Sequence, residues 1–129
     1  MGRRAIPRSM LLRVCVYQPA DELGIFIAHC LELDLMGQGT CVESALDELL
    51  EVIDSQIETC KKTGANFWFY APARVWQIYA QAKKANRKIA SELVERVVER
   101  ANRRRGHPAP DLENIAASKD VPKKYLAPI

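Results

Sequence analysis

The chain has 129 residues, of which 48% are hydrophobic and 27% are charged, and its formal net charge at pH 7 is +3. These values are typical of one globular domain with a single core. No apolar run approaches the roughly 18 residues of a membrane span. The apolar stretch behind the basic start is interrupted by Arg13 and lacks a signal-peptide cleavage motif, so we expect a cytoplasmic protein.

Four cysteines are present, and none of them forms a C-x-x-C pair: Cys15, Cys30, Cys41 and Cys60. A disulfide framework would need an export signal, and a zinc site would need closely spaced ligand pairs. His29 is adjacent to Cys30, and neighbouring residues of a strand point to opposite faces. We therefore expect reduced core cysteines, no bound metal and no cofactor.

The charges are divided between two halves of the chain. From Gln18 to Thr59 there are ten acidic residues and no lysine or arginine, whereas from Arg74 to Arg105 ten basic residues face three acidic ones. Such asymmetry predicts either a charged partner or two halves that neutralise each other.

The N-terminal third predicts a basic arm followed by a small sheet. Residues 1–9 are the arm. Residues 11–17 and 25–31 are rich in alternating apolar residues, and the Pro, Asp and Gly between them favour a turn, so we predict an antiparallel hairpin. Residues 35–39 can add a short third strand, in which two glycines suggest a bulge or a tight bend.

A helix from about Val42 to Cys60 is the strongest local prediction. Thr40 and Glu43 form a T-x-x-E capping box, and apolar residues recur behind it at helical spacing. Two lysines followed by Gly64 are typical of a helix end. The outer face of this helix is acidic and consists of Glu43, Asp47, Glu48, Glu51, Asp54 and Glu58.

The second half predicts helices. The aromatic residues 66–71 indicate a fourth strand or an extended segment, and Pro72 can open a helix. Two apolar stripes come next, either as two helices broken near Asn86 or as one long helix. We expect four parts in the chain: a basic arm (1–9), a sheet-and-helix domain (10–71), a helical extension (72–106) and a flexible or loosely docked tail (107–129).

Residues 24–35 (GIFIAHCLELDL), 38–40 (QGT) and 42–46 (VESAL) occur in an order that resembles the HicB family of antitoxins. The resemblance covers about residues 11–62. It implies an α+β fold of truncated ribonuclease-H type, in which a three- or four-stranded antiparallel sheet carries one packed helix. It also implies a protein that masks a small basic ribonuclease toxin and forms oligomers. Many relatives bind operator DNA through a C-terminal helix-turn-helix or ribbon-helix-helix, but this chain lacks the short glycine-containing turn of a helix-turn-helix after Lys62.

The sequence predicts no enzyme. Two-metal phosphoryl chemistry needs clustered carboxylates, and the first strand has none. Asp21, Glu32 and Asp34 either cluster at one sheet edge or are solvated loop acids. As a general base His29 would need a positioned partner, and the adjacent Cys30 faces away, which favours a core or edge histidine.

The charge pattern supports two binding hypotheses, beside that of a stand-alone oligomeric protein of the same fold without a toxin. In the first, the acidic helix meets a basic toxin at Asp47, Glu51 and Asp54. In the second, basic residues of the helical extension contact nucleic acid phosphates. These residues are Arg87, Lys88, Arg96, Arg100, Arg103 and Arg104. Alternatively they form a solvated helix face, or they dock against the acidic helix of the same or another subunit.

A homodimer is also expected, because the first 62 residues alone bury a marginal core and leave open sheet edges. We predict that the second half covers the sheet and that part of its apolar stripe packs across a two-fold axis. The residues assigned to this interface are Trp76, Val94, Val97 and Val98.

Overall fold

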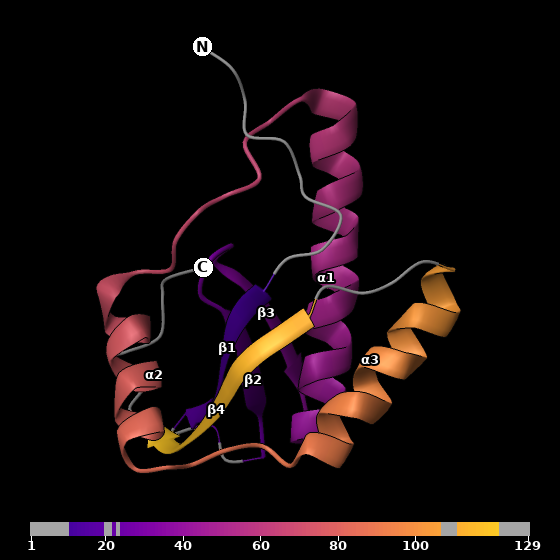
Figure 1. Ribbon diagram of the computed structural model, residues 1–129. Helices are drawn as coiled ribbons and strands as arrows, with labels where there is room; N and C mark the ends of the chain where they lie inside the picture. Colours follow the sequence, from indigo (N-terminus) through magenta and orange to yellow (C-terminus); the bar gives the residue numbers. More distant parts are fainter. Residues whose placement is uncertain (1–10, 20–21, 23, 107–110, 122–129) are drawn as a thin grey trace.

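Four strands and three helices form an α+β fold in the computed structural model, which describes residues 11–19, 22, 24–106 and 111–121 (Figure 1). This confirms the predicted class. In chain order the elements are β1 (Leu11–Pro19), β2 (Phe26–Cys30), β3 (Leu35–Gly39), α1 (Val42–Thr63), α2 (Ala73–Lys84), α3 (Ser91–Arg105) and β4 (Asp111–Val121). Within these described ranges no helix is both long and apolar enough to cross a membrane.

The first two strands form the predicted antiparallel hairpin, with Val14 opposite Cys30, and β3 adds the predicted short third strand. Because neighbouring side chains of a strand point to opposite faces, Val14 and Val16 enter the core under α1. Cys15 and Tyr17 enter a second core under α2. Both faces of the sheet are therefore covered, which explains why most of β1 is buried.

The sheet is mixed rather than antiparallel throughout, which corrects the predicted architecture. Its strand order is β3-β2-β1-β4, and β4 runs parallel to β1. The register extends from Leu11 opposite Asp111 to Pro19 opposite Val121, with two irregularities between them. A parallel neighbour requires a long crossover connection, and here α1, α2 and α3 all lie in the chain between β1 and β4.

Strand β4 also corrects the prediction of a flexible tail for residues 111–121. The composition of this segment gives little sign of a strand, because few of its residues are large and apolar. Its place is set by the edge of β1, which offers unpaired backbone groups, and by the burial of Ile115 and Ala116. The rest of the predicted arm and tail lies outside the described residues, namely residues 1–9, 107–110 and 122–129.

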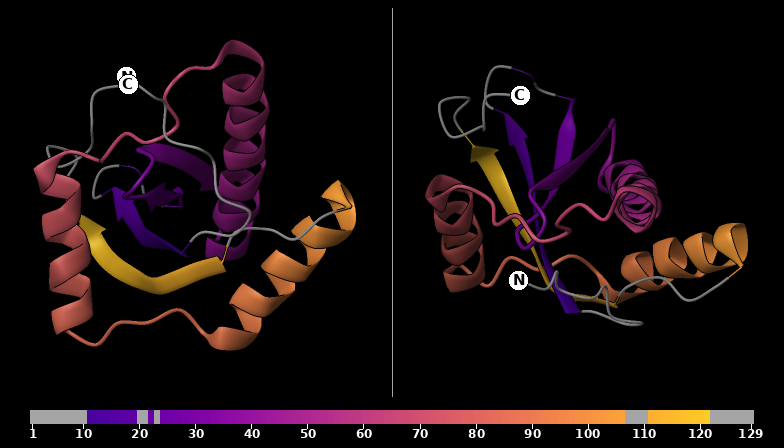
Figure 2. Two further views of the ribbon diagram at one scale, coloured as in Figure 1. Left: turned by 45° about the horizontal axis from the view of Figure 1, so that its top comes forward. Right: turned by 90° about the horizontal axis from the view of Figure 1, so that it is seen from above.

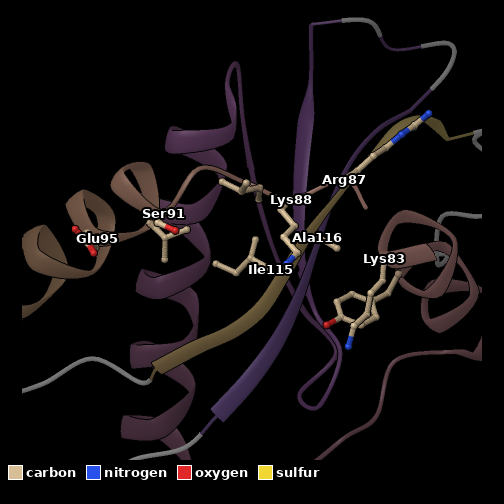
Figure 3. Close-up of a pocket in the computed structure, with 10 residues that line it drawn as sticks. Lys83, Arg87, Lys88, Ser91, Glu95, Ile115 and Ala116 are labelled. Atoms are coloured by element: carbon tan, nitrogen blue, oxygen red, sulfur yellow. The ribbon is translucent and has the colours of Figure 1, made fainter. Parts of the chain in front are cut away.

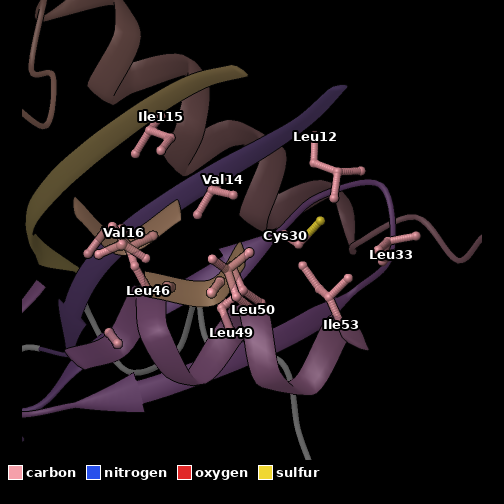
Figure 4. Close-up of a cluster of buried hydrophobic side chains, with 14 of the residues drawn as sticks. Leu12, Val14, Val16, Cys30, Leu33, Leu46, Leu49, Leu50, Ile53 and Ile115 are labelled. Carbon is pink, nitrogen blue, oxygen red and sulfur yellow. The ribbon is translucent and has the colours of Figure 1, made fainter. Parts of the chain in front are cut away.

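The larger core lies between the sheet and α1 (Figure 4). Leu46, Leu49 and Leu50 of α1 are completely or almost completely buried against strand residues such as Val14. Each leucine buried in this way contributes roughly 1.5–3 kcal/mol. Val97 of α3 joins the same cluster, so α3 is attached to the domain by apolar contact as well as by charge.

The two glycines of β3 serve a close approach between strand and helix. We expected a bulge or a tight bend there, but the pairing of β2 with β3 is regular. A Cβ at Gly37 would overlap the backbone of Leu49, and one at Gly39 would overlap Ser44. Glycine is needed at these positions because α1 crosses β3 at backbone distance.

The N-cap residue of helix α1 is one position later in the chain than predicted. The N-cap is Cys41, whose sulfur accepts from the Ser44 amide at 3.4 Å, while the Ser44 hydroxyl accepts from the Cys41 amide at 3.2 Å. The expected pair of Thr40 and Glu43 does not form the box, which leaves the Glu43 carboxylate available for α3. At the other end Gly64 adopts the predicted left-handed cap, with φ at 72°.

Helix α2 covers the opposite face of the sheet from α1 and α3 (Figure 2). Residues 66–71, one alternative for which was a fourth strand, form an irregular connection in which the Ala71 amide donates to the Leu31 carbonyl at 2.8 Å. The two apolar stripes are separate helices, because Asn86 has a φ of 56° and breaks the chain direction between them. Three layers result, with the sheet in the middle.

Candidate functional site: an acidic helix paired with a basic helix

The arginines of α3 pair with the carboxylates of α1 along one line, which we call the charged seam. The nitrogen–oxygen distances are 3.1 Å for Arg96–Glu43, 2.8 Å for Arg100–Glu43, 2.7 Å for Arg100–Asp47, 3.8 Å for Arg104–Glu51 and 2.6 Å for Arg105–Asp54. Side chains four residues apart lie on one face of a helix. Glu43, Asp47 and Glu51 have this spacing, and so do Arg96, Arg100 and Arg104. The two helices therefore match along the seam, which ends at the Arg105–Asp54 pair.

The pairs of the seam differ in exposure. The Arg96 side chain is 56% exposed and that of Arg104 is 43% exposed, so water and salt screen these charges and each pair contributes little to folding. Arg105 is only 5% exposed, and its Nη2 donates to Asp54 at 2.6 Å. Its other terminal nitrogen is buried without a hydrogen-bond acceptor in the described part of the chain. Asp54 therefore compensates a largely buried charge, whereas Glu51 does not.

The contacts within the seam shift the pKa values of two of its charged groups. Hydrogen bonds from Arg100 and then Arg96 lower the pKa of the Glu43 carboxyl below its ordinary value. Hydrogen bonds to Asp47 and Glu43 raise the pKa of the Arg100 guanidinium. Both shifts favour the charged forms of Glu43 and Arg100, so α3 offsets part of the acidic face of α1.

The structure divides the six basic residues that we assigned to nucleic acid. Arg96, Arg100 and Arg104 lie in the seam, which is the alternative of docking against the acidic helix of the same subunit. Arg103 pairs at 3.9 Å with Glu99 of its own helix. Arg87 and Lys88 line a separate hollow beside β4, with Lys88 next to Ala116 (Figure 3). A continuous basic stripe for nucleic acid is therefore not formed by these six residues.

The acidic residues assigned to a partner also face α3. Asp47 is engaged by Arg100, whereas Glu51 and Asp54 border an open hollow of about 340 Å³ next to the end of the seam. We call it the acidic hollow. Its lining consists of Leu50, Glu51, Asp54, Ser55, Glu58, Arg104 and Arg105. Three carboxylates against two guanidiniums leave it with an excess of negative charge.

The spacing of the charged residues is the signal that could have revealed the seam. Glu43, Asp47 and Glu51 recur every four residues, and so do Arg96, Arg100 and Arg104. Two helices with complementary rows of equal spacing can pair in register. The sequence does not say whether the matching row belongs to the same chain or to another one.

A buried polar network lies on the α2 side of the sheet. His29 Nε2 is 2.8 Å from Asp34 Oδ1, and its Nδ1 is 3.1 Å from the Tyr17 hydroxyl. A carboxylate only accepts, so Nε2 donates to Asp34 and Nδ1 accepts from Tyr17. Burial lowers the pKa of His29 and raises that of Tyr17. Both side chains are fully buried, so no substrate reaches them and the network holds the turn after β2.

Of the three acids that either cluster at the sheet edge or are solvated, the two that the structure describes have structural roles. Glu32 accepts from the Arg13 amide at 2.8 Å and from its guanidinium at 2.6 Å, and Asp34 accepts from His29. Asp21 lies outside the described residues. In the described part of the chain no group of three or more His, Cys, Asp or Glu side chains is placed to hold a metal ion.

The cysteines are all reduced, and three of the four are buried as expected. Cys41 differs because it is exposed at the start of α1. Hydrogen bonds to the Ser44 hydroxyl and amide lower the pKa of the Cys41 thiol, whereas burial raises the pKa of Cys15 and Cys30 to about 12. Cys41 is a capping residue, a role that its position next to Thr40 concealed in the sequence.

The stripe assigned to a dimer interface packs largely within the chain. Val97 is fully buried in the larger core, and Val94 and Val98 are partly buried against it. Trp76 donates from its ring nitrogen to the Ala71 carbonyl at 3.1 Å and lies edge-on to Tyr70. Val97 is therefore unavailable for the contact between subunits that we predicted.

Comparison of this chain with protein-family models, with curated proteins and with solved structures gives no match. The function of the chain is therefore inferred from its own charges, contacts and hollows.

Proposed function

We propose that this chain is a non-catalytic binding module, of the kind that the HicB antitoxins represent, which holds a basic element of a partner protein at the acidic hollow. The observation that carries this proposal is the seam itself. The acidic face of α1 holds a row of arginines on a helix, which is the chemistry that a basic partner would offer.

The acidic hollow is the part of this face where a partner can add contacts without displacing α3. The Glu51 side chain is 60% exposed, and its contact with Arg104 is long at 3.8 Å. Glu58 is exposed, and no ion pair involves it within the described residues. A lysine or arginine from a partner can therefore reach Glu51 and Glu58 at little cost. The Arg105–Asp54 pair keeps α3 in place beside them.

The groups that the sequence offered for catalysis are enclosed or engaged in the described part of the chain, which supports a binding role. His29 is enclosed, Glu32 and Asp34 are engaged in hydrogen bonds, and the thiols of Cys15 and Cys30 are buried. Exposed opposite charges raise association rates and fix orientation more than they raise affinity.

Where a short basic protein is encoded next to this chain, co-expression of the two tests the proposal. The two proteins should co-purify, and calorimetry should show affinity that falls as salt rises. The double variant Glu51→Gln/Glu58→Gln should weaken binding about tenfold, because two charge contacts are lost. Glu92→Gln, which changes an exposed acid on α3 away from the hollow, is the matched control. Failure to co-purify, or equal affinity of the double variant and the control, would contradict the proposal.

A further inference from the structure

We propose that the hollow beside β4 binds a phosphomonoester about the size of a mononucleotide. We call this hollow the basic pocket. It has a volume of about 410 Å³ and is lined by Tyr79, Lys83, Arg87, Lys88, Ile89, Ser91, Val94, Glu95, Ile115 and Ala116 (Figure 3). This inference goes beyond the proposed function. The basic pocket lies on another face of α3 from the charged seam, and its ligand is negatively charged, whereas the partner at the acidic hollow is basic.

The backbone that carries the basic side chains is fixed. After the left-handed turn at Asn86, the Arg87 amide donates to the Ala82 carbonyl at 2.9 Å and the Arg87 carbonyl accepts from the Ala117 amide at 3.2 Å. Lys88 forms an antiparallel bridge with Ala116 on the outer edge of β4. The backbone at these residues thus needs no ordering when a ligand binds, which lowers the entropic cost of binding.

Among the residues whose side chains the structure describes, Lys83, Arg87 and Lys88 form no ion pair, in contrast to the arginines of the seam. Glu95 is the single carboxylate among the described lining residues. Lys83 lies 6.0 Å above the ring of Tyr79. A phosphate monoester carries between one and two negative charges at pH 7, and cationic side chains bind it through charge-assisted hydrogen bonds.

The other half of the lining is apolar and defines the organic part of the ligand. Ile89, Val94, Ile115 and Ala116 form this side. A volume of about 410 Å³ falls within the range of small-molecule sites and exceeds what a phosphate ion alone would fill. A planar or apolar body attached to one phosphate matches both halves, as in a mononucleotide.

A single phosphorylated end fits better than a continuous nucleic acid backbone. Binding along a backbone needs a row of cations that tracks successive phosphates. The next arginines along α3, Arg96 and Arg100, point into the seam and are paired with Glu43 and Asp47. The described cations that line the pocket are therefore Lys83, Arg87 and Lys88, and Figure 3 shows the Arg87 side chain extending away from Lys88.

Titration of the whole protein with adenosine 5′-monophosphate, adenosine and inorganic phosphate, monitored by amide NMR shifts, tests this inference. The monophosphate should saturate at millimolar concentration or below and shift the amides of Lys88, Ser91 and Ala116. Adenosine and phosphate should each bind at least about tenfold more weakly, because each fills half of the site. Equal binding of adenosine would overturn the role of the phosphate, and equal binding of inorganic phosphate would overturn the role of the apolar side.

Variants and oligonucleotides complete the test. Lys83→Ala and Lys88→Ala should each weaken the monophosphate about three- to tenfold, while Lys84→Ala, an exposed neighbour outside the lining, should leave it unchanged. A short oligonucleotide with a 5′-phosphate should compete if the source of the ligand is a strand end, and should fail to compete if it is a free nucleotide. Competition by the unphosphorylated oligonucleotide, or equal effects of the three lysine variants, would overturn the inference. Neither result depends on the basic partner protein.

Discussion

The charged seam and the basic pocket are built from the same run of basic residues, between Lys83 and Arg105, yet they are physically different. In the seam every arginine meets a carboxylate of α1, and the charges cancel within the chain. In the pocket Lys83, Arg87 and Lys88 meet one carboxylate among ten lining residues. A run of charge therefore has no single meaning, because its function depends on whether matching charges lie opposite it in the same fold.

Replacing the apolar contact beneath the seam should have the largest effect. Val97 is fully buried in the core, so Val97→Asp places a carboxylate where it has no partner. We expect a loss of about 3–5 kcal/mol in the free energy of unfolding, measured by urea denaturation. Arg104→Ala, which removes an exposed charge of the seam, should cost less than about 0.5 kcal/mol. If the Val97→Asp protein stays folded and only its oligomeric state changes, Val97 lies in a subunit interface as the sequence predicted.

Asp54 and Glu51 both border the acidic hollow, but their substitutions should change the free energy of unfolding by different amounts in urea denaturation. Asp54→Ala leaves Arg105 without its partner, and the Arg105 side chain is 5% exposed. Removing one member of a buried pair costs several kcal/mol, but Asp54 itself is 34% exposed, so we expect about 1–3 kcal/mol. Glu51→Ala should lie within about 0.5 kcal/mol of the unchanged protein. Equal losses would mean that the seam acts as one unit rather than as separate pairs.

Acid should weaken the fold before either charged region changes its charge. Burial lowers the folded-state pKa of His29 below its ordinary 6.5, so the unfolded chain takes up a proton first as pH falls. Stability should thus be fully present above about pH 6.5 and should decrease below it, by at most about 1.4 kcal/mol per pH unit for one proton.

The histidine variants check this assignment. Between pH 7 and pH 5 the free energy of unfolding should lose its slope in His29→Gln and keep it in His107→Gln. The Glu43 carboxyl, whose pKa is lowered, should contribute only below pH 4.5. The window from pH 5 to pH 7 therefore isolates His29 from the seam, and a slope that survives in His29→Gln would contradict the buried neutral imidazole.

Elements with strong local signals could be predicted from the sequence. Alternation, helical spacing and turn residues are enough to predict the hairpin, α1 with its glycine end and the break near Asn86. Strand β4 could not be predicted, because its position depends on the free edge of β1 rather than on its own composition. The cap at Cys41 could not be predicted either, because the T-x-x-E rule selects Thr40 and Glu43, whereas the box that forms uses the Cys41 sulfur and the Ser44 hydroxyl.

The candidate site was predictable in its residues but not in its arrangement. The sequence identified the acidic face of α1 and the basic residues of α3 as important surfaces. It also left open that they dock on each other. What it lacked was the direction in which each helix presents its charges. For α3 that direction puts Arg96 and Arg100 against α1, and the packing of Val97 and Ala101 in the larger core sets it. Lys88 precedes α3 and is placed beside β4 by its bridge to Ala116.

The smallest expected effect has the most informative sign. Removing a paired charge from the seam should lower stability slightly, whereas removing an unpaired charge from the basic pocket should relieve repulsion among Lys83, Arg87 and Lys88. We therefore expect Arg104→Ala to lower the free energy of unfolding and Lys88→Ala to raise it, each by a few tenths of a kcal/mol and up to about 0.5 kcal/mol. Lys84→Ala is the control for the loss of an exposed lysine. Urea denaturation at low salt and again at 0.5 M sodium chloride should show the two values converge, because salt screens exposed charges beyond roughly 3–10 Å. A loss of stability in Lys88→Ala that exceeds the loss in Arg104→Ala at low salt would mean that Lys88 is neutralised within the fold, and the contrast between the seam and the pocket would then disappear.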